Sequence, residues 1–127
     1  MKTSDIAKQA VRLGGQKALE FFTNRDQLTI DVKGPQDYVS EADRTVEAIM
    51  IDFLHSHFPD DGFLGEESSE ITQAKQWVID PIDGTTNFIR GLPYFCTTLA
   101  LVENEQVIGG WVFDPTRDEL YEANLGY

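Results

Sequence analysis

Two aspartates at the end of an apolar run are the residues of this sequence best suited to carry chemistry. In residues 77–88 (WVIDPIDGTTNF), the run ends on Asp80, and Asp83 follows after a proline and an isoleucine. A buried strand has no packing reason to end on two carboxylates, because an uncompensated buried charge costs several kcal/mol. A bound cation would compensate both charges. The pattern therefore predicts a metal site.

The spacing of the two aspartates sets a condition on the backbone. Residues three apart on a regular strand point to opposite faces, so Asp80 and Asp83 converge only if the chain turns between them. Pro81 fixes its own φ and favours such a turn. The turn would take the Ile82 carbonyl out of sheet pairing and leave it available as a ligand. Two carboxylates and a carbonyl suit a hard cation, and we predict Mg²⁺.

The residues after Asp83 form an anion-binding pattern. Gly84 allows the backbone to approach a ligand closely. Thr85 and Thr86 would begin a short helix, and the backbone N–H groups at a helix N-terminus bind phosphate. The sequence thus predicts that a metal and a phosphate group bind side by side.

The composition places these motifs in one folded domain. The chain has 127 residues and 41% hydrophobic content, which is enough for a core. Its net charge of −12 disfavours nucleic acid as a direct ligand. The single cysteine, Cys96, excludes an internal disulfide and suits a reducing compartment. Because no signal peptide or long apolar span is visible, we predict a soluble cytoplasmic protein with no membrane partner.

Hydrophobic periodicity predicts two helices ahead of the motif. The first would be capped by Ser4 and run to about Asn24, and its Gly14-Gly15 pair costs roughly 1 kcal/mol per glycine relative to alanine. We therefore expect another element to approach closely at these glycines. The second helix would begin near Ser40 and stop at Pro59. Residues 28–32 between the two helices are predicted to form a short strand.

Acidic residues upstream of the motif have ordinary structural explanations. Ser40 and Asp43 have nearly the spacing of a capping box, which gives Asp43 a role at the start of the second helix. In residues 63–68 (FLGEES), a short apolar run again ends on acids, but a Glu-Glu pair alone is most often a solvated turn. Spacing alone therefore leaves both readings open.

The pattern changes to β after the motif. Residues 96–102, 107–113 and 119–123 are separated by short turn-rich connectors, which predicts an antiparallel meander. The Gly109-Gly110 pair inside the second of these strands suggests a bulge. We expect Cys96 to be a small buried residue rather than a reactive thiolate, because it has no charged neighbour in sequence.

Residues 65–68 (GEES) and 77–88 together resemble the inositol monophosphatase family, including its bacterial members of the extragenic suppressor type. The resemblance runs through nearly the whole chain and covers about the first half of a family member. It implies an α/β (α+β) layered sandwich of the sugar-phosphatase type, in which residues 1–127 form the N-terminal metal- and phosphate-binding half, with two helices on an antiparallel sheet. Members carry one more metal-binding aspartate in a Trp-Asp motif of the second half, which this sequence lacks.

The resemblance also implies roles for individual residues. Two or three Mg²⁺ ions would be held by Glu66, Asp80, the Ile82 carbonyl and Asp83. The substrate phosphate would be bound by Asp83, Gly84, Thr85 and Thr86. The attacking water would be oriented or activated by Thr85, Asp43 and Glu66. Glu67 would lie beside the metal ligands or bind a third ion, and Lys33 would be a basic residue near that loop.

The implied reaction is hydrolysis of a phosphate monoester, first of all inositol 1-phosphate, by two-metal activation of water with inhibition by lithium. Other members of the superfamily act on fructose-1,6-bisphosphate, adenosine 3′,5′-bisphosphate or NADP, and these substrates stay open. The family further implies a homodimer. An alternative is a non-catalytic regulatory protein, because some bacterial relatives act with the transcription machinery.

Two other classes of site were considered from the motif itself. Phosphatases that form an aspartyl phosphate also carry an Asp, Asp, Gly, Thr pattern, but a single residue separates their acids, whereas Pro81 and Ile82 intervene here. A calcium-binding EF-hand loop needs alternating oxygen ligands and a closing glutamate, which are missing after Asp80. Both comparisons favour the two-metal phosphatase.

Overall fold

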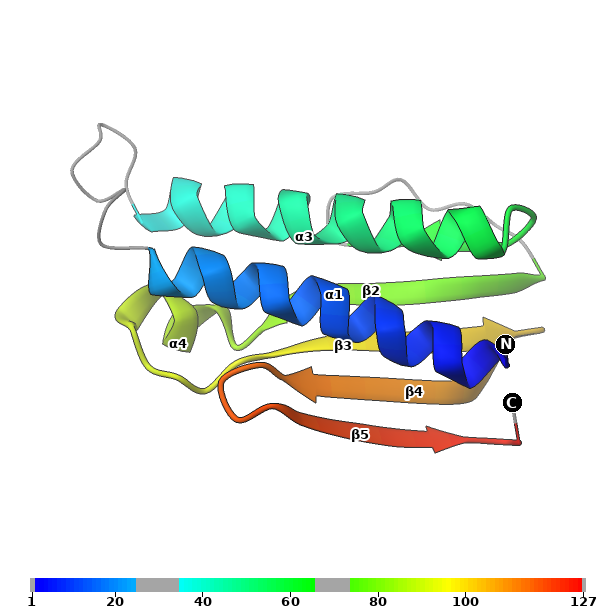
Figure 1. Ribbon diagram of the computed structural model, residues 1–127. Coiled ribbons are helices and arrows are strands. Elements are labelled where there is room, and N and C mark those ends of the chain that lie inside the picture. Colours follow the sequence, from blue (N-terminus) through cyan, green and yellow to red (C-terminus); the bar gives the residue numbers. More distant parts are fainter. Residues whose placement is uncertain (1, 25–34, 66–73, 127) are drawn as a thin grey trace.

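Two long helices lie side by side on one face of a five-stranded sheet (Figure 1). The computed structural model describes residues 2–24, 35–65 and 74–126. Helix α1 spans Thr3–Thr23 and helix α3 spans Pro35–His57. A third, short helix, α4 (Thr85–Arg90), follows the second strand. The predicted pair of long helices is therefore present, while the strand predicted for residues 28–32 lies outside the described residues.

The five strands follow one another across the sheet in the order of the sequence. They are β1 (Gly62–Leu64), β2 (Lys75–Asp83), β3 (Cys96–Glu103), β4 (Gln106–Asp114) and β5 (Glu119–Asn124). Strands β2 to β5 pair antiparallel, which confirms the predicted meander. The expectation of a purely antiparallel sheet is wrong at one edge, because β1 pairs with β2 in parallel. With three residues, β1 is too short to show a periodicity that could have predicted it.

The core lies between the helices and the sheet. Trp77 of β2 and Trp111 of β4 are fully covered and pack with their ring centroids 5.9 Å apart. The close approach predicted at the two glycines of α1 is confirmed. A Cβ at Gly14 would collide with the Met50 side chain of α3, and a Cβ at Gly15 would collide with the Phe113 ring of β4. The glycines therefore let α1 sit close to both layers.

Both long helices begin earlier than predicted. Helix α3 starts at Pro35, and a proline at the first helical position has its φ already set for a helix. Ser40 therefore lies inside α3 and cannot cap it, and Asp43 is a buried interior residue instead of a partner in a capping box. Ser4 likewise lies inside α1, one residue after its start. The predicted ends of the two helices agree with the structure.

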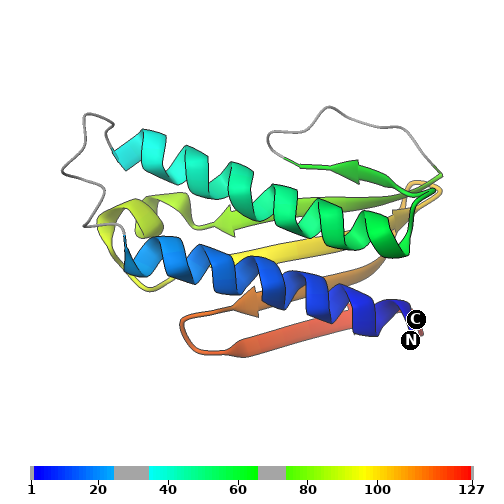
Figure 2. The same cartoon turned by 45° about the horizontal axis from the view of Figure 1, so that its top comes forward.

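One end of the molecule gathers the segments that carry the predicted site. In both views, α4 lies where α1 ends and α3 begins (Figures 1 and 2). The end of β2, the start of β3 and the turn between β4 and β5 lie at the same end. No helix in the described part of the chain carries an apolar stretch long enough to pass through a bilayer.

Candidate metal and phosphate site

The two aspartates of β2 are separated by a bulge. Asp80 pairs with Thr98 and Asp83 pairs with Cys96, so two residues of β2 lie opposite one residue of β3. The buried Thr97 hydroxyl donates a hydrogen bond to the Pro81 carbonyl at 2.8 Å. The predicted turn away from the sheet is wrong, because β2 continues to Asp83. The predicted break in the ladder is present, because Pro81 and Ile82 have no register partner on β3, and one extra residue changes which face the following side chain meets.

The charges of Asp80 and Asp83, together with that of Asp114, act on the Cys96 thiol. Burial and then the charges of Asp83, Asp114 and Asp80 raise the pKa of Cys96 from 9.0 to about 11. The raised pKa agrees with the prediction of an unreactive thiol, whereas the predicted burial is only partial. Asp114 was not predicted as a member of this group. The register of the meander could have found it, because Thr97 pairs with Phe113 and so places Asp114 near Cys96.

The chemistry of the oxygen atoms at the bulge fits a hard cation. Asp80 is partly buried with its Oδ1 atom covered, and Asp83 is exposed. The Ile82 carbonyl accepts a hydrogen bond from Thr85 Oγ1 at 3.2 Å, and a carbonyl oxygen has a second lone pair for a further partner. The described residues include no group of three or more His, Cys, Asp or Glu side chains placed to hold a metal. The roles of the Asp80 and Asp83 carboxylates and of the Ile82 carbonyl as metal ligands stay predictions.

The segment Gly84–Thr86, here called the phosphate turn, has a backbone that requires glycine at its start. Gly84 has φ of 100°, in the left-handed region. A Cβ there would also lie 2.9 Å from the Tyr94 carbonyl oxygen and 3.3 Å from the Phe95 Cα atom. Thr85 and Thr86 occupy the first positions of α4, where backbone N–H groups have no partner within the helix. The expected short helix is present.

Aromatic packing anchors the buried side of α4. Phe88 is buried and meets Phe22 of α1 and Phe95 edge to face, with centroids 5.5 Å and 5.2 Å away. Helix α3 also packs against α4 and carries the buried Asp43. Asp43 therefore belongs to α3, which contacts α4, the helix that begins in the phosphate turn. Its predicted action on water stays a prediction.

The second acidic segment lies only partly within the described residues. Glu66, Glu67 and Lys33 lie outside them, so their predicted roles stay predictions. Leu64, the last residue of β1, pairs with Val78, two residues before Asp80. The chain therefore reaches Gly65 alongside the strand that carries the first aspartate. Sequence reasoning missed Glu47, a buried acid one turn after Asp43, whose carboxylate packs against Gly65.

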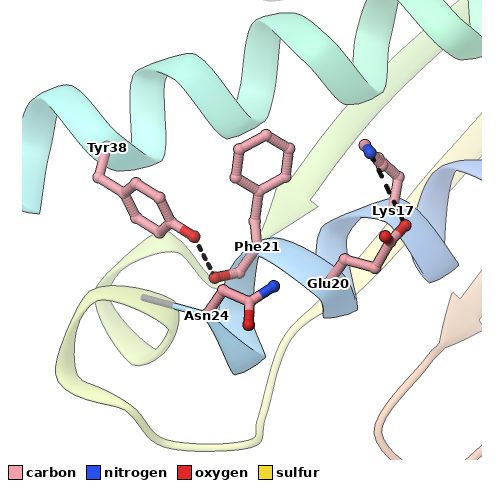
Figure 3. Close-up of a pocket in the computed structure, with 5 residues that line it drawn as sticks. All are labelled: Lys17, Glu20, Phe21, Asn24 and Tyr38. Atoms are coloured by element: carbon pink, nitrogen blue, oxygen red, sulfur yellow. Dashed lines mark hydrogen bonds and ion pairs between the residues drawn. The ribbon is translucent and has the colours of Figure 1, made fainter. Parts of the chain in front are cut away.

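Two of the surface hollows in the described part of the chain lie beside α4 and at the start of α3. One of about 370 Å³ borders the predicted site and is lined by Asp83, Gly84, Tyr94, Phe95, Cys96, Val112, Asp114, Arg117 and Tyr121. The other, of about 160 Å³, lies between the end of α1 and the start of α3 (Figure 3). There Lys17 pairs with Glu20 at 3.8 Å, and the Tyr38 hydroxyl donates to the Phe21 carbonyl. Only the first hollow includes residues predicted to bind metal or phosphate.

The chain belongs to the inositol monophosphatase family, whose model matches residues 2–127. An inositol-1-monophosphatase of Rhizobium meliloti is 42% identical over 125 residues, which are 96% of this chain and 47% of that protein. The Nus factor SuhB of Escherichia coli K12 is 37% identical over 125 residues, with the same coverage of 96% and 47%.

The fold is also shared with solved structures of the family. The extragenic suppressor protein SuhB of Bartonella henselae superposes with a TM-score of 0.84 at 36% identity, over 97% of this chain and 49% of that one. The predicted membership and the α/β fold are thereby confirmed. The chain spans about half the length of the curated relatives it matches.

Proposed function

We propose that the protein hydrolyses a phosphate monoester with Mg²⁺, and that inositol 1-phosphate is its first candidate substrate. The observation that carries the proposal is the bulge of β2. It places one extra residue between Asp80 and Asp83, and Gly84 follows directly. Acidic oxygens and a backbone turn suited to phosphate thus follow each other within a few residues. Membership of the inositol monophosphatase family supports this reaction class.

The ligands proposed for the metal are Glu66, Asp80, the Ile82 carbonyl and Asp83. Bound Mg²⁺ would supply neutralising charge and make a coordinated water more acidic. The two described carboxylates sit at the ends of the bulge, where the Thr97 hydrogen bond to Pro81 holds the backbone. This hydrogen bond would keep the spacing of the carboxylates constant through the reaction.

The phosphate turn would bind the transferred group and orient the attacking water. The backbone N–H groups of Thr85 and Thr86 would donate to phosphate oxygens. Because the Thr85 hydroxyl donates its own proton to the Ile82 carbonyl, its lone pairs would accept a proton of water. Asp43 and Glu66 would share the activation of that water. No covalent phosphoenzyme is needed.

The test is phosphate release from inositol 1-phosphate by the intact protein, with and without Mg²⁺ and with lithium added. Asp83→Asn should abolish release without unfolding the protein. Asp118→Asn is the matched control, because it makes the same change at an exposed aspartate on the same meander. Fructose-1,6-bisphosphate, adenosine 3′,5′-bisphosphate and NADP in parallel assays would decide the substrate. Full activity of Asp83→Asn would refute the proposal.

A second candidate function is binding to the transcription machinery. The observation that favours it is the 37% identity to a relative named a Nus factor. The net charge of −12 points to a protein partner rather than to direct contact with RNA. Binding of purified RNA polymerase by the intact protein, retained in Asp83→Asn, would support this role. A homodimer, as is common in the family, would be tested by sedimentation.

A further inference from the structure

The turn between β4 and β5 is organised by one carboxylate. Asp114 Oδ1 accepts hydrogen bonds from the backbone N–H groups of Thr116 at 3.0 Å and Arg117 at 3.3 Å. Its Oδ2 atom accepts from the Arg117 guanidinium at 2.9 Å. Partial burial would raise the pKa of Asp114, but the hydrogen bonds from Thr116 and Arg117 hold it below its ordinary value. The turn is therefore fixed by a charged acceptor.

This turn holds the loop that follows α4. The Thr116 hydroxyl lies 2.7 Å from Asp114 Oδ1 and 3.1 Å from the Pro93 carbonyl, so its proton is shared between the two. Arg117 Nη1 donates to the same Pro93 carbonyl at 3.4 Å. The guanidinium also lies over the Tyr94 ring, 4.8 Å from its centroid. The side chains of Thr116 and Arg117 thus hold the exposed loop at Pro93 and Tyr94 by hydrogen bonds and a cation–π contact.

The loop at Pro93 and Tyr94 packs directly against the phosphate turn. The Tyr94 carbonyl oxygen would be 2.9 Å from a Cβ at Gly84, and the Asn87 side chain of α4 donates to it at 2.8 Å. Helix α4 has only six residues, and helices this short are not stable by themselves. Its buried side is anchored by Phe88. Its solvent side needs a second support.

We propose that Arg117 and Thr116 are positioning residues that hold Pro93 and Tyr94 against Gly84 and thereby fix the backbone N–H groups that bind phosphate. The inference rests on the proposed function, because it assigns these residues to the same site. Arg117, together with Asp114 and Tyr94, lines the hollow of about 370 Å³ beside Asp83. The two positioning residues act through the loop and need no contact with the reacting atoms.

The test compares four variants of the intact protein in Mg²⁺ buffer: Arg117→Ala, Thr116→Val, Thr116→Ser and Arg12→Ala. Arg12 is the matched control, because it also pairs with an aspartate, Asp118 at 3.2 Å, and lies over a ring, that of Phe113. The two arginine side chains are similarly exposed, at 45% for Arg12 and 43% for Arg117. Inorganic phosphate is the probe, and its affinity is measured by calorimetry.

We expect Arg117→Ala and Thr116→Val each to weaken phosphate binding by about three- to tenfold, which matches the loss of one or two hydrogen bonds. Arg12→Ala should bind like the wild type, and Thr116→Ser, which keeps the hydroxyl, should restore the affinity. Hydrogen exchange gives a readout that needs no ligand: amides 84–88 should exchange faster in the two weakened variants and not in Arg12→Ala.

The outcomes separate the inference from the function on which it rests. Wild-type phosphate affinity and wild-type amide exchange in both Arg117→Ala and Thr116→Val would overturn the positioning role. A loss confined to Arg117→Ala would also overturn it, because it would assign the effect to the charge of the guanidinium. If the wild-type protein itself binds no phosphate with Mg²⁺ present, the proposed function fails, whatever the exchange rates show.

Discussion

The hydroxyl of Thr97 donates a hydrogen bond to the carbonyl of Pro81 inside the sheet, at 2.8 Å. Thr97 has no exposed surface, and Pro81 is the first residue of the bulge between the two aspartates. Pro81 has no register partner on β3, and its carbonyl accepts a hydrogen bond from a side chain of that neighbouring strand instead. The spacing of the predicted metal ligands thus depends on a buried threonine.

Thr97→Val should destabilise the protein by about 1–3 kcal/mol, because it leaves the Pro81 carbonyl buried without its partner. Valine has nearly the shape of threonine, so the packing change is small. Urea unfolding would measure the loss, and calorimetry would show whether Mg²⁺ affinity falls with it. Thr97→Ser keeps the donor and should retain the affinity. An unchanged unfolding midpoint in Thr97→Val would contradict the assigned bond.

Gly84→Ala should destabilise the protein more than Gly126→Ala. Both glycines have positive φ, 100° and 93°, so both substitutions carry the backbone strain of roughly 1–3 kcal/mol. A Cβ at Gly126 meets no atom within 4 Å, whereas at Gly84 it meets the Tyr94 carbonyl at 2.9 Å. The difference between the two unfolding free energies therefore reports the contact alone. Equal losses would mean that Tyr94 moves aside freely.

Cys96 should react slowly with iodoacetamide in metal-free protein. With a pKa of about 11 in place of 9.0, its thiolate fraction near neutral pH is roughly one-hundredth of that of an unperturbed thiol. Asp83→Asn should speed the reaction, because the Asp83 charge raises the pKa of Cys96 more than any other charge does. The thiol of the unfolded chain ionises at lower pH than that of the folded protein, so the folded state loses stability as pH rises from 9 to 11. Alkylation rates across this range would check the ionisation of Cys96, and free energies of unfolding over the same range would check the loss of stability.

Ser40→Ala should change the free energy of unfolding by less than about 0.5 kcal/mol, because Ser40 lies inside α3 and alanine is the better helix former there. If the helix began at Ser40, the same change would remove a cap and cost about 1 kcal/mol. Chemical denaturation distinguishes the two. A loss of the larger size would return Ser40 to the helix start and Asp43 to its capping role.

The sequence was sufficient to predict the elements whose side chains repeat over many residues. The helical periodicity of α1 extends over several turns, and the alternation of side chains extends along each of the strands β3 to β5. Both agree with the structure. The start of α3 at Pro35 differs from the predicted start near Ser40, although proline suits the first position of a helix. Strand β1 was missed because it is too short.

At the site, sequence reasoning identified the residues that are neighbours along the chain. Asp80, Asp83 and Gly84 follow one another, so a single motif contains them. Asp114 and Arg117 reach the same place only through the pairing of β3 with β4 and the folding of the next turn onto Pro93. Such contacts depend on strand register, which single residues do not reveal.

Each strand of the sheet lies beside the strand that precedes or follows it in sequence, and this order affects how the molecule folds. Asn104 and Glu105, the two residues between β3 and β4, both have positive φ, at 51° and 67°, as a tight two-residue hairpin requires. Closing so short a loop costs little chain entropy, and each later strand can add to the edge beside it. We expect this hairpin to form first on the folding pathway. The bulge with its two aspartates would then be shaped when β2 joins it, before any ligand is present.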